Sequence, residues 1–384
     1  MIYLDNASTT PCLKESAEIV KNKLVDDFFN PSAKYLPAFE VSKELDHARK
    51  RLVELLGGNT STYSVVFTGS ATEANNLVLN SSLNRHKLNI VSVGEHASVY
   101  ETAKKFKENG FKIAELSLNN NGCVSVDEFK NLMTVDTAFI SVMMVSNETG
   151  AINDIKSIVS AARKVNPKVL VHVDAVQAFG KIKIDLEELG VDYMTLSSHK
   201  VEGPKGVGAL VYRIKSKLEP QILGGGQESG KRSGTENLPA ILGFINSATI
   251  LNEKRIESFE RVKAFRASLI EKLSVKASEC GLKFIVNGAQ DNQSPYILSC
   301  GFVGTKGEVL LHALASQNIY VGTGSACNSK HSGNRILTAM GRNKDEVECN
   351  IRLSFMEETT REDVDSLSST IVGLAKKHNA DKKG

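Results

Sequence analysis

The chain has 384 residues, of which 41% are apolar and 24% charged, as in ordinary globular proteins. Its net charge of +3 is too small to indicate a nucleic-acid surface, and no apolar run approaches the roughly 20 residues needed to cross a bilayer. Six cysteines in a chain of this length are not typical of a disulfide framework, and none of them form a C-x-x-C pair. We therefore expect neither a disulfide framework nor a zinc site. With no signal-peptide pattern at the start, we expect a reducing, cytoplasmic location.

Strand-like apolar runs and helical stretches alternate through the first part of the chain. The runs cover residues 64–67, 89–93, 139–145, 169–173 and 206–212, with helical stretches such as 99–108 and 155–165 between them. This alternation predicts an α/β lobe with a mostly parallel sheet flanked by helices. A long helical stretch over 237–273 then leads into a smaller α+β lobe. We expect a large domain over residues 13–255 and a small domain made of residues 1–12 and 256–384.

Lys200 and Asp174 are the most informative pair. Lys200 ends a strand-like segment before a Gly-Pro-rich turn, and Asp174 ends the apolar run 169–173. A lysine can hold the aldehyde of pyridoxal 5′-phosphate (PLP) covalently, and a carboxylate can keep the pyridine nitrogen of this cofactor protonated. The pair therefore predicts a PLP enzyme. The alternatives are a surface lysine and a helix-capping aspartate.

The segment 67–76 is a candidate phosphate site. It follows a strand and opens a helix at Ala71 and Thr72, where exposed N–H groups attract phosphate. The alternative is a capping box formed by Ser70 and Glu73, a common signature of helix starts.

Further polar side chains follow the predicted strands, at the edge where parallel sheets bind ligands. They are His96, Asn147, Gln177, Ser197, Ser198 and His199. Ser197, Ser198 and His199, which directly precede Lys200, can bind the cofactor phosphate. The alternative is that they are ordinary polar loop residues. Gln177 can donate to the phenolic oxygen of the cofactor, and Asn147 can reach the ring or the substrate. The imidazole of His96 can stack on the ring and shuttle protons, although a lone histidine after a strand is more often incidental.

Cys327 lies among small and polar residues, which predicts an accessible loop whose thiol can act as a nucleophile. Cys300 and Cys349 are instead typical of buried packing residues. Arg352 alternates with apolar residues, as is typical of a strand. Its side chain can bind a carboxylate through two parallel hydrogen bonds. The alternative is a surface arginine on a strand. Thr235 is a candidate helix cap or phosphate donor.

The glycine-rich run 225–231 matches most of a P-loop. The residue that follows is Arg232 rather than serine or threonine, so the hydroxyl that would bind magnesium is missing. We therefore do not expect nucleotide hydrolysis at this run.

Together these motifs resemble the cysteine desulfurases of the NifS/IscS type, which are fold-type I PLP enzymes similar to class-V aminotransferases. The match extends from residues 3–11 to the strand of Arg352 and includes residues 71–73, 95–96, 147–150, 172–177, 197–200, 232–237 and 324–327. The resemblance implies that Lys200 carries PLP, that His96 stacks on its ring and serves in acid–base steps, and that Cys327 receives sulfur as a persulfide. It also implies that Arg352, with Asn147, binds the substrate.

The resemblance implies cofactor contacts from Ala71, Thr72, His96, Asn147, Asp174, Gln177, Ser197, Ser198, His199 and Lys200. It further implies that Thr235 reaches the phosphate of the other subunit, so we expect a homodimer. The implied reaction converts L-cysteine to L-alanine and passes sulfur to an acceptor protein, such as an iron–sulfur scaffold or a tRNA-thiolation enzyme. No nucleic acid, membrane or resident metal is implied, although Cys327 can be a transient iron–sulfur ligand with a scaffold partner.

Other readings stay open. A selenocysteine lyase, a cysteine sulfinate desulfinase and a class-V aminotransferase share this scaffold, and a non-catalytic scaffold is a further alternative. The chain departs from the family at Tyr35, Glu202 and Ser229, where a histidine, an aromatic residue and an arginine are common. We expect these departures to affect the partner surface and the tuning of substrate binding rather than the cofactor.

Overall fold

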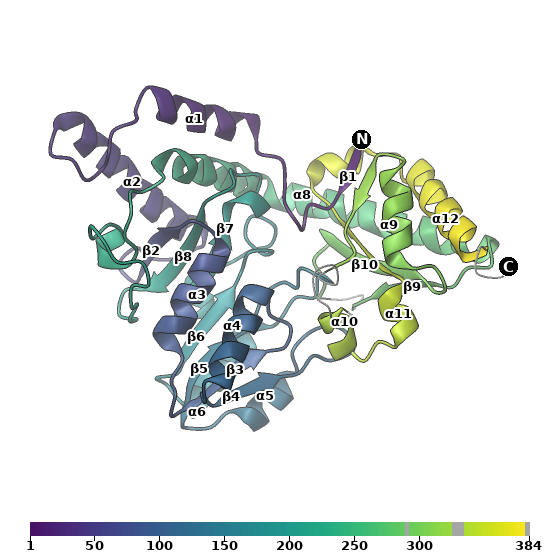
Figure 1. Ribbon diagram of the computed structural model, residues 1–384, viewed down its shortest axis with the longest axis horizontal. Helices are drawn as coiled ribbons and strands as arrows, with labels where there is room; N and C mark the ends of the chain where they lie inside the picture. Colours follow the sequence, from purple (N-terminus) through teal and green to yellow (C-terminus); the bar gives the residue numbers. More distant parts are fainter. Residues whose placement is uncertain (289–291, 325–333, 381–384) are drawn as a thin grey trace.

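The computed structural model describes residues 1–288, 292–324 and 334–380, which form two lobes joined by one long helix (Figure 1). The large lobe is built on a seven-stranded sheet in the order β2-β8-β7-β6-β5-β3-β4. Its strands are β2 (Tyr63–Thr68), β3 (Leu88–Ser92), β4 (Ile113–Leu116), β5 (Thr137–Ser141), β6 (Leu170–Asp174), β7 (Tyr193–Ser197) and β8 (Gly208–Arg213). Strands β3 to β7 run parallel and β8 is antiparallel to both of its neighbours, which confirms the mostly parallel sheet.

Helices cover both faces of this sheet. They are α2 (Leu36–Leu55), α3 (Ala71–Ser82), α4 (Ala97–Glu108), α5 (Val126–Leu132), α6 (Ile155–Val165) and α7 (Leu186–Leu189). Along β2, Val65 and Phe67 pack in the core shared with α2 and α6, whereas Val66 packs in the core shared with α3 and α4. Burial on both faces explains why the strands are almost continuously apolar in the sequence.

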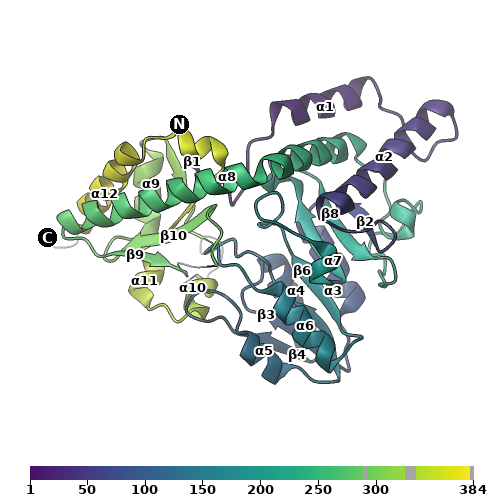
Figure 2. The same cartoon turned by 180° about the vertical axis from the view of Figure 1, so that it is seen from behind.

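The helix α8 (Leu238–Glu279) connects the two lobes and runs along both of them (Figure 2). Its first residues, among them Phe244, pack in the core of the large lobe, while Phe265 and Leu269 pack in the core of the small lobe. The side chain of Asn237 caps the helix by accepting from Ala240 N at 3.3 Å, so Thr235 is not the cap, and its other candidate role as a phosphate donor stays a prediction. The domain limit at residues 255/256 falls inside α8 and stays a prediction.

In the part of the small lobe that the structure describes, two sheets pack with the α-helices α9 to α12 and the second half of α8. Strands β9 (Phe284–Asn287), β10 (Ile297–Phe302) and β12 (Asn350–Ser354) form an antiparallel sheet in the order β12-β10-β9, and β1 (Ile2–Leu4) pairs in parallel with β11 (Ile319–Val321). The helices are α9 (Gly307–Ala315), α10 (Arg335–Ala339), α11 (Lys344–Glu348) and α12 (Val364–Ala380). The chain thus begins in the small lobe.

The segment after β1 returns to the large lobe along the turn that carries Lys200. Thr10 N donates to His199 O at 2.9 Å, and Leu13 N donates to Glu202 O at 2.8 Å. From there, α1 (Lys14–Val25) and α2 form an arm that projects from the large lobe (Figure 1). This path places residues 5–10 between the ends of the large sheet and the small lobe.

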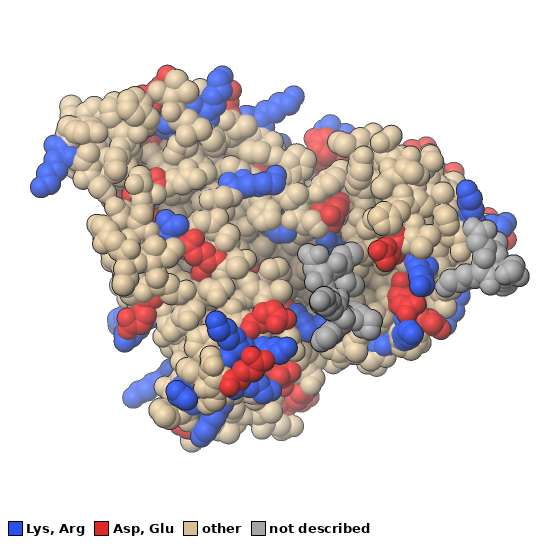
Figure 3. All heavy atoms as spheres, in the orientation of Figure 1, with Lys and Arg blue, Asp and Glu red and all other residues tan. Residues whose placement is uncertain are grey.

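Acidic and basic side chains are intermixed on the face of the molecule shown in Figure 3. Lys and Arg do not gather there into one basic patch. In the described ranges, none of the helices combines the length and the apolarity needed to span a membrane.

Candidate active site

Lys200 lies directly after β7, in a single helical turn (Ser198–Lys200). Its Nζ donates to the carbonyl oxygens of Ala7 at 2.6 Å and Ser8 at 2.5 Å. Burial lowers the pKa of Lys200 to about 8, Arg352 lowers it further, and the carboxylates of Asp5 and Asp174 oppose this shift. Near neutral pH the amine therefore has a sizeable free-base fraction, which is the form that attacks an aldehyde.

Asp174 ends β6 and is 2% exposed. One of its oxygens accepts from Asn75 Nδ2 at 2.9 Å and the other from Val176 N at 3.0 Å. Because both oxygens accept, the arrangement suits an ionised carboxylate, as the role opposite a pyridine nitrogen requires. Asn75 lies on α3, and the sequence motifs did not single it out.

His96 is connected to Asp174 through side chains. Its Nδ1 lies 2.8 Å from Ser98 Oγ and accepts from Ser98 N at 3.2 Å. Ser98 Oγ in turn accepts from Asn75 Nδ2 at 2.8 Å, the same amide nitrogen that donates to Asp174. In the neutral ring, Nδ1 is thus the acceptor and Nε2 carries the proton. The histidine also caps α4, so its place in the fold is defined.

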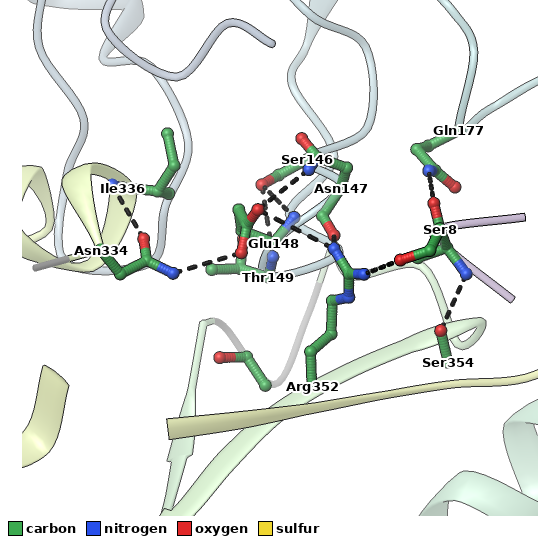
Figure 4. Close-up of polar contacts among 12 residues, drawn as sticks. Ser8, Ser146, Asn147, Glu148, Thr149, Gln177, Asn334, Ile336, Arg352 and Ser354 are labelled. Carbon is green, nitrogen blue, oxygen red and sulfur yellow. Dashed lines mark hydrogen bonds and ion pairs between the residues drawn. The ribbon is translucent and has the colours of Figure 1, made fainter. Parts of the chain in front are cut away.

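Arg352 on β12 is only 5% exposed, so it is not a surface arginine. Its Nη1 donates to Asn147 O at 2.9 Å and its Nη2 donates to Ser8 Oγ at 2.7 Å (Figure 4). Nη2 also donates to Asp5 Oδ1 at 2.9 Å. Glu148 Oε1 lies 3.8 Å from Nη1 and accepts from Asn147 Nδ2 at 3.0 Å. The guanidinium is therefore held rigidly between the small lobe and the loop that follows β5.

Gln177 lies in the turn after β6 and is buried. Its Nε2 donates to Ala7 O at 2.9 Å, the carbonyl that also accepts from Lys200. Its Oε1 accepts from Lys181 Nζ at 3.1 Å. The sequence motifs singled out neither Ala7 nor Lys181, because a backbone carbonyl and an isolated lysine leave no pattern.

The start of α3 lies against the end of the sheet beside Lys200. Gly208 pairs with Ser197, and a Cβ on Gly208 would lie 2.7 Å from Ala71 N, so only a glycine admits this approach. Ser70 accepts from Glu73 N at 3.1 Å, which confirms Ser70 as the helix cap, whereas Glu73 Oε2 accepts from Gly69 N at 2.8 Å rather than from Ser70 N, so the reciprocal bond of a capping box is shifted by one residue. Capping leaves the Thr72 side chain exposed, so it does not exclude a phosphate there.

The turn of Lys200 adds further polar groups. The hydroxyl of Ser198 is buried and has no hydrogen-bond partner among the described residues. A buried hydroxyl in this position is costly unless it finds a partner, which a phosphate oxygen can provide. His199 Nδ1 lies 3.2 Å from Thr9 Oγ1, and burial lowers the pKa of His199 to about 4, so its ring is neutral. Amine, carboxylate and helix start thus converge in a set that fits PLP.

Comparisons with known proteins show the family of the chain. The model of the class-V aminotransferase family matches residues 2–367. The chain belongs to the class-V aminotransferase family. Cysteine desulfurase IscS 1 of Archaeoglobus fulgidus is 35% identical over 97% of this chain and 97% of its own length. Cysteine desulfurase IscS of Methanosarcina thermophila is 35% identical over 98% of this chain and 92% of its own length.

Solved structures extend the likeness to three dimensions. A structure described as a NifS-like protein superposes with a TM-score of 0.89 at 31% identity, over 97% of this chain and 98% of that one. Because the class-V aminotransferase match and this superposition both span the two lobes, the fold of the whole chain is that of a fold-type I PLP enzyme, as the resemblance implied.

For two of the predicted site residues, the described part of the chain shows no contact with the surroundings of Lys200. Cys327 lies outside the described residues. Thr235 is exposed and lines a groove of about 420 Å³ with residues of the α1–α2 connection, including Phe28 and Phe29. In this class-V aminotransferase the roles of both residues therefore stay predictions. Cys300 and Cys349 are buried, as expected.

Proposed function

We propose that this chain acts as a PLP-dependent cysteine desulfurase that converts L-cysteine to L-alanine and moves the sulfur onto Cys327. The observation that carries the proposal is the meeting of Lys200 and Arg352 at Ser8, where Lys200 contacts the backbone oxygen and Arg352 contacts the side-chain hydroxyl. Relatives named cysteine desulfurases, similar along nearly the whole chain, support the reaction.

Bound PLP would supply an electron sink for bond changes at the substrate α carbon. Lys200 would hold it covalently, Asp174 would keep its pyridine nitrogen protonated, and Gln177 would donate to its phenolic oxygen. The start of α3 at Ala71 and Thr72 and the turn of Ser197, Ser198 and His199 would hold its phosphate.

Substrate binding, proton transfer and sulfur transfer fall to residues of the chain itself. Arg352 binds the substrate carboxylate, which orients the α carbon toward Lys200. Lys200 Nζ or His96 moves the α proton. The Cys327 thiolate then attacks the substrate sulfur, so that the Cβ–S bond breaks and an S–S bond forms. In sum, L-cysteine and the enzyme thiol give L-alanine and an enzyme persulfide, which is balanced in atoms and electrons.

We further propose that two chains form the functional dimer. Leu24, Phe28, Leu36 and Phe39 on the α1–α2 arm are all more than half exposed, and Leu24 and Phe28 line the groove of Thr235. Several large apolar side chains left exposed on one arm of a fold favour an interface with another chain. Light scattering should give twice the chain mass, and Leu36→Glu with Phe39→Glu should reduce it.

The sulfur would then pass to an acceptor protein, for iron–sulfur cluster assembly or another thiolation pathway. Because a reactive thiol survives best in a reducing compartment, we propose that the enzyme works in the cytoplasm.

Product analysis tests the proposal. Protein loaded with PLP should give L-alanine from L-cysteine, together with an equal amount of sulfur. Lys200→Ala should give neither, and borohydride should fix PLP to the wild-type chain but not to this variant. Release of a keto acid in place of alanine would indicate an aminotransferase, and absence of borohydride-fixed PLP would contradict the proposal.

A further inference from the structure

Lys181 is a buried lysine that the reaction outlined above does not use. Lys181 is 2% exposed, and its Nζ donates to Oε1 of Gln177 at 3.1 Å. The ring of Tyr296 lies 6.0 Å from Nζ. Buried lysines are usually paired with a carboxylate. Here the hydrogen-bond partner is a neutral amide, so the contact calls for an explanation other than charge pairing.

The contact determines which way round the amide of Gln177 lies. The Lys181 amine donates, and therefore needs the amide oxygen on its side. The carbonyl of Ala7 only accepts, and it lies 2.9 Å from Nε2 on the opposite side. A flipped amide would oppose donor to donor and acceptor to acceptor. Lys181 and Ala7 thus keep the amide nitrogen of Gln177 toward Lys200, with its second hydrogen available to a ligand.

Charged groups of both lobes surround Lys181. Burial lowers the pKa of Lys181 to about 7; Lys200 and Arg352 lower it further, and Glu202 raises it. Burial raises the pKa of Glu202 to about 7, with Lys181 and Lys254 opposing and Glu357 and Glu358 reinforcing this shift. The charge next to Gln177 therefore changes close to neutral pH, within the range in which the enzyme would work.

We propose that Lys181 is a positioning residue that acts through Gln177, keeping the donor side of this amide toward the phenolic oxygen of PLP and so tuning the protonation of the cofactor bound at Lys200. This inference rests on the proposed function, because it requires PLP on Lys200. Lys181 lies outside the sequence motifs on which the proposed function is based.

The sign of the effect follows from electrostatics. A donor to the phenolic oxygen stabilises negative charge on that oxygen, and a nearby cation repels a proton on the linkage between lysine and cofactor. Both effects ease loss of that proton. Loss of Lys181 should therefore raise the pH midpoint at which the visible absorption of the bound cofactor changes.

The experiment is a spectral pH titration of the PLP-loaded protein. We expect Lys181→Met to raise the midpoint by about half a unit or more, and Lys181→Arg, which keeps a donor and its charge, to restore it. Lys205→Met is the matched control, because Lys205 is an exposed lysine in the turn after Lys200, and it should leave the midpoint unchanged. Should Lys181→Met not fold, Lys181→Leu, which likewise has neither a donor nor a charge, takes its place.

A double-mutant cycle tests whether Lys181 acts through Gln177. In a Gln177→Leu background, the shift caused by Lys181→Met should shrink by more than half. A fully retained shift in that background, or an unchanged midpoint in Lys181→Met with PLP still bound, would overturn the inference and leave the proposed function intact. Absence of lysine-bound PLP in the wild-type protein would instead overturn the proposed function, and the inference with it.

Discussion

Lys200 and Arg352 meet at one residue, Ser8. The carbonyl oxygen of Ser8 accepts from Lys200 Nζ at 2.5 Å. The hydroxyl of Ser8 accepts from Arg352 Nη2 at 2.7 Å (Figure 4). Lys200 follows β7 of the large lobe and Arg352 lies on β12 of the small lobe. The segment after β1 therefore sets the position of the predicted cofactor lysine relative to the predicted substrate arginine.

Arg352→Lys should weaken substrate binding more than it slows the chemical step. A lysine keeps the charge but loses the planar fork that binds a carboxylate at two points. We expect KM for L-cysteine to rise about tenfold or more, with a smaller change in kcat. Arg361→Lys, at an exposed arginine, is the control. An unchanged KM in Arg352→Lys would show that the carboxylate binds elsewhere.

Asn75→Ala should loosen the support of Asp174. The substitution removes a donor from a buried carboxylate oxygen and breaks the chain of hydrogen bonds to His96. We expect a loss of about 1–3 kcal/mol in the free energy of unfolding, and faster release of PLP on dilution. Asn76→Ala, at a half-buried neighbour on the same helix, should retain PLP. Equal behaviour of the two variants would argue against a special role for Asn75.

Capture of PLP by the cofactor-free protein should follow the protonation of Lys200. Because burial lowers the pKa of Lys200 to about 8, the reactive free amine appears as the pH rises through that value. The rate of borohydride-trapped PLP incorporation should therefore rise with a midpoint near 8. A rate that continues to climb toward the ordinary lysine pKa would mean that the amine is not shifted.

Glu95 should make the protein less stable as the pH rises. Burial raises the pKa of Glu95 to about 8, with Asp174 adding to the shift, so the folded chain holds a proton that the unfolded chain releases above about pH 5. Stability from this group is lost between pH 5 and 8, by up to about 1.4 kcal/mol per pH unit.

Glu95→Gln imitates the protonated carboxyl group and should remove this dependence. Denaturant unfolding should then give similar stabilities for variant and wild type at pH 5, and a more stable variant at pH 8. Glu101→Gln, at an exposed position, is the control. A wild-type slope retained in Glu95→Gln would locate the pH dependence in another group.

The spacing of apolar residues predicted many of the helices and strands, and the ends of the predicted strands indicated where the site lies. The helical stretch 155–165 is α6 to the residue, and both Asp174 and Lys200 follow buried strands at one edge of the sheet. Such features are local, since they depend on apolar spacing along the chain.

Features that depend on distant segments could not be predicted. The carbonyls of Ala7 and Ser8 reach Lys200 only because β1 belongs to the small lobe, and backbone groups carry no sequence signal. Lys181 lies in no segment with a periodic apolar pattern, so the sequence did not predict that its side chain is buried. The cap of α8 is Asn237, two residues after the candidate Thr235, because threonine and asparagine are both common at helix starts and the sequence alone does not show where the helix begins.

The proposed sulfur transfer predicts where the sulfur is found on the chain after turnover. After the PLP-loaded protein turns over L-cysteine, mass spectrometry of alkylated peptides should find one extra sulfur atom on the Cys327 peptide and none on the other five cysteines. Cys327→Ser should keep the bound cofactor and form no L-alanine. Undiminished alanine formation by Cys327→Ser, or extra sulfur only on another cysteine, would contradict the account.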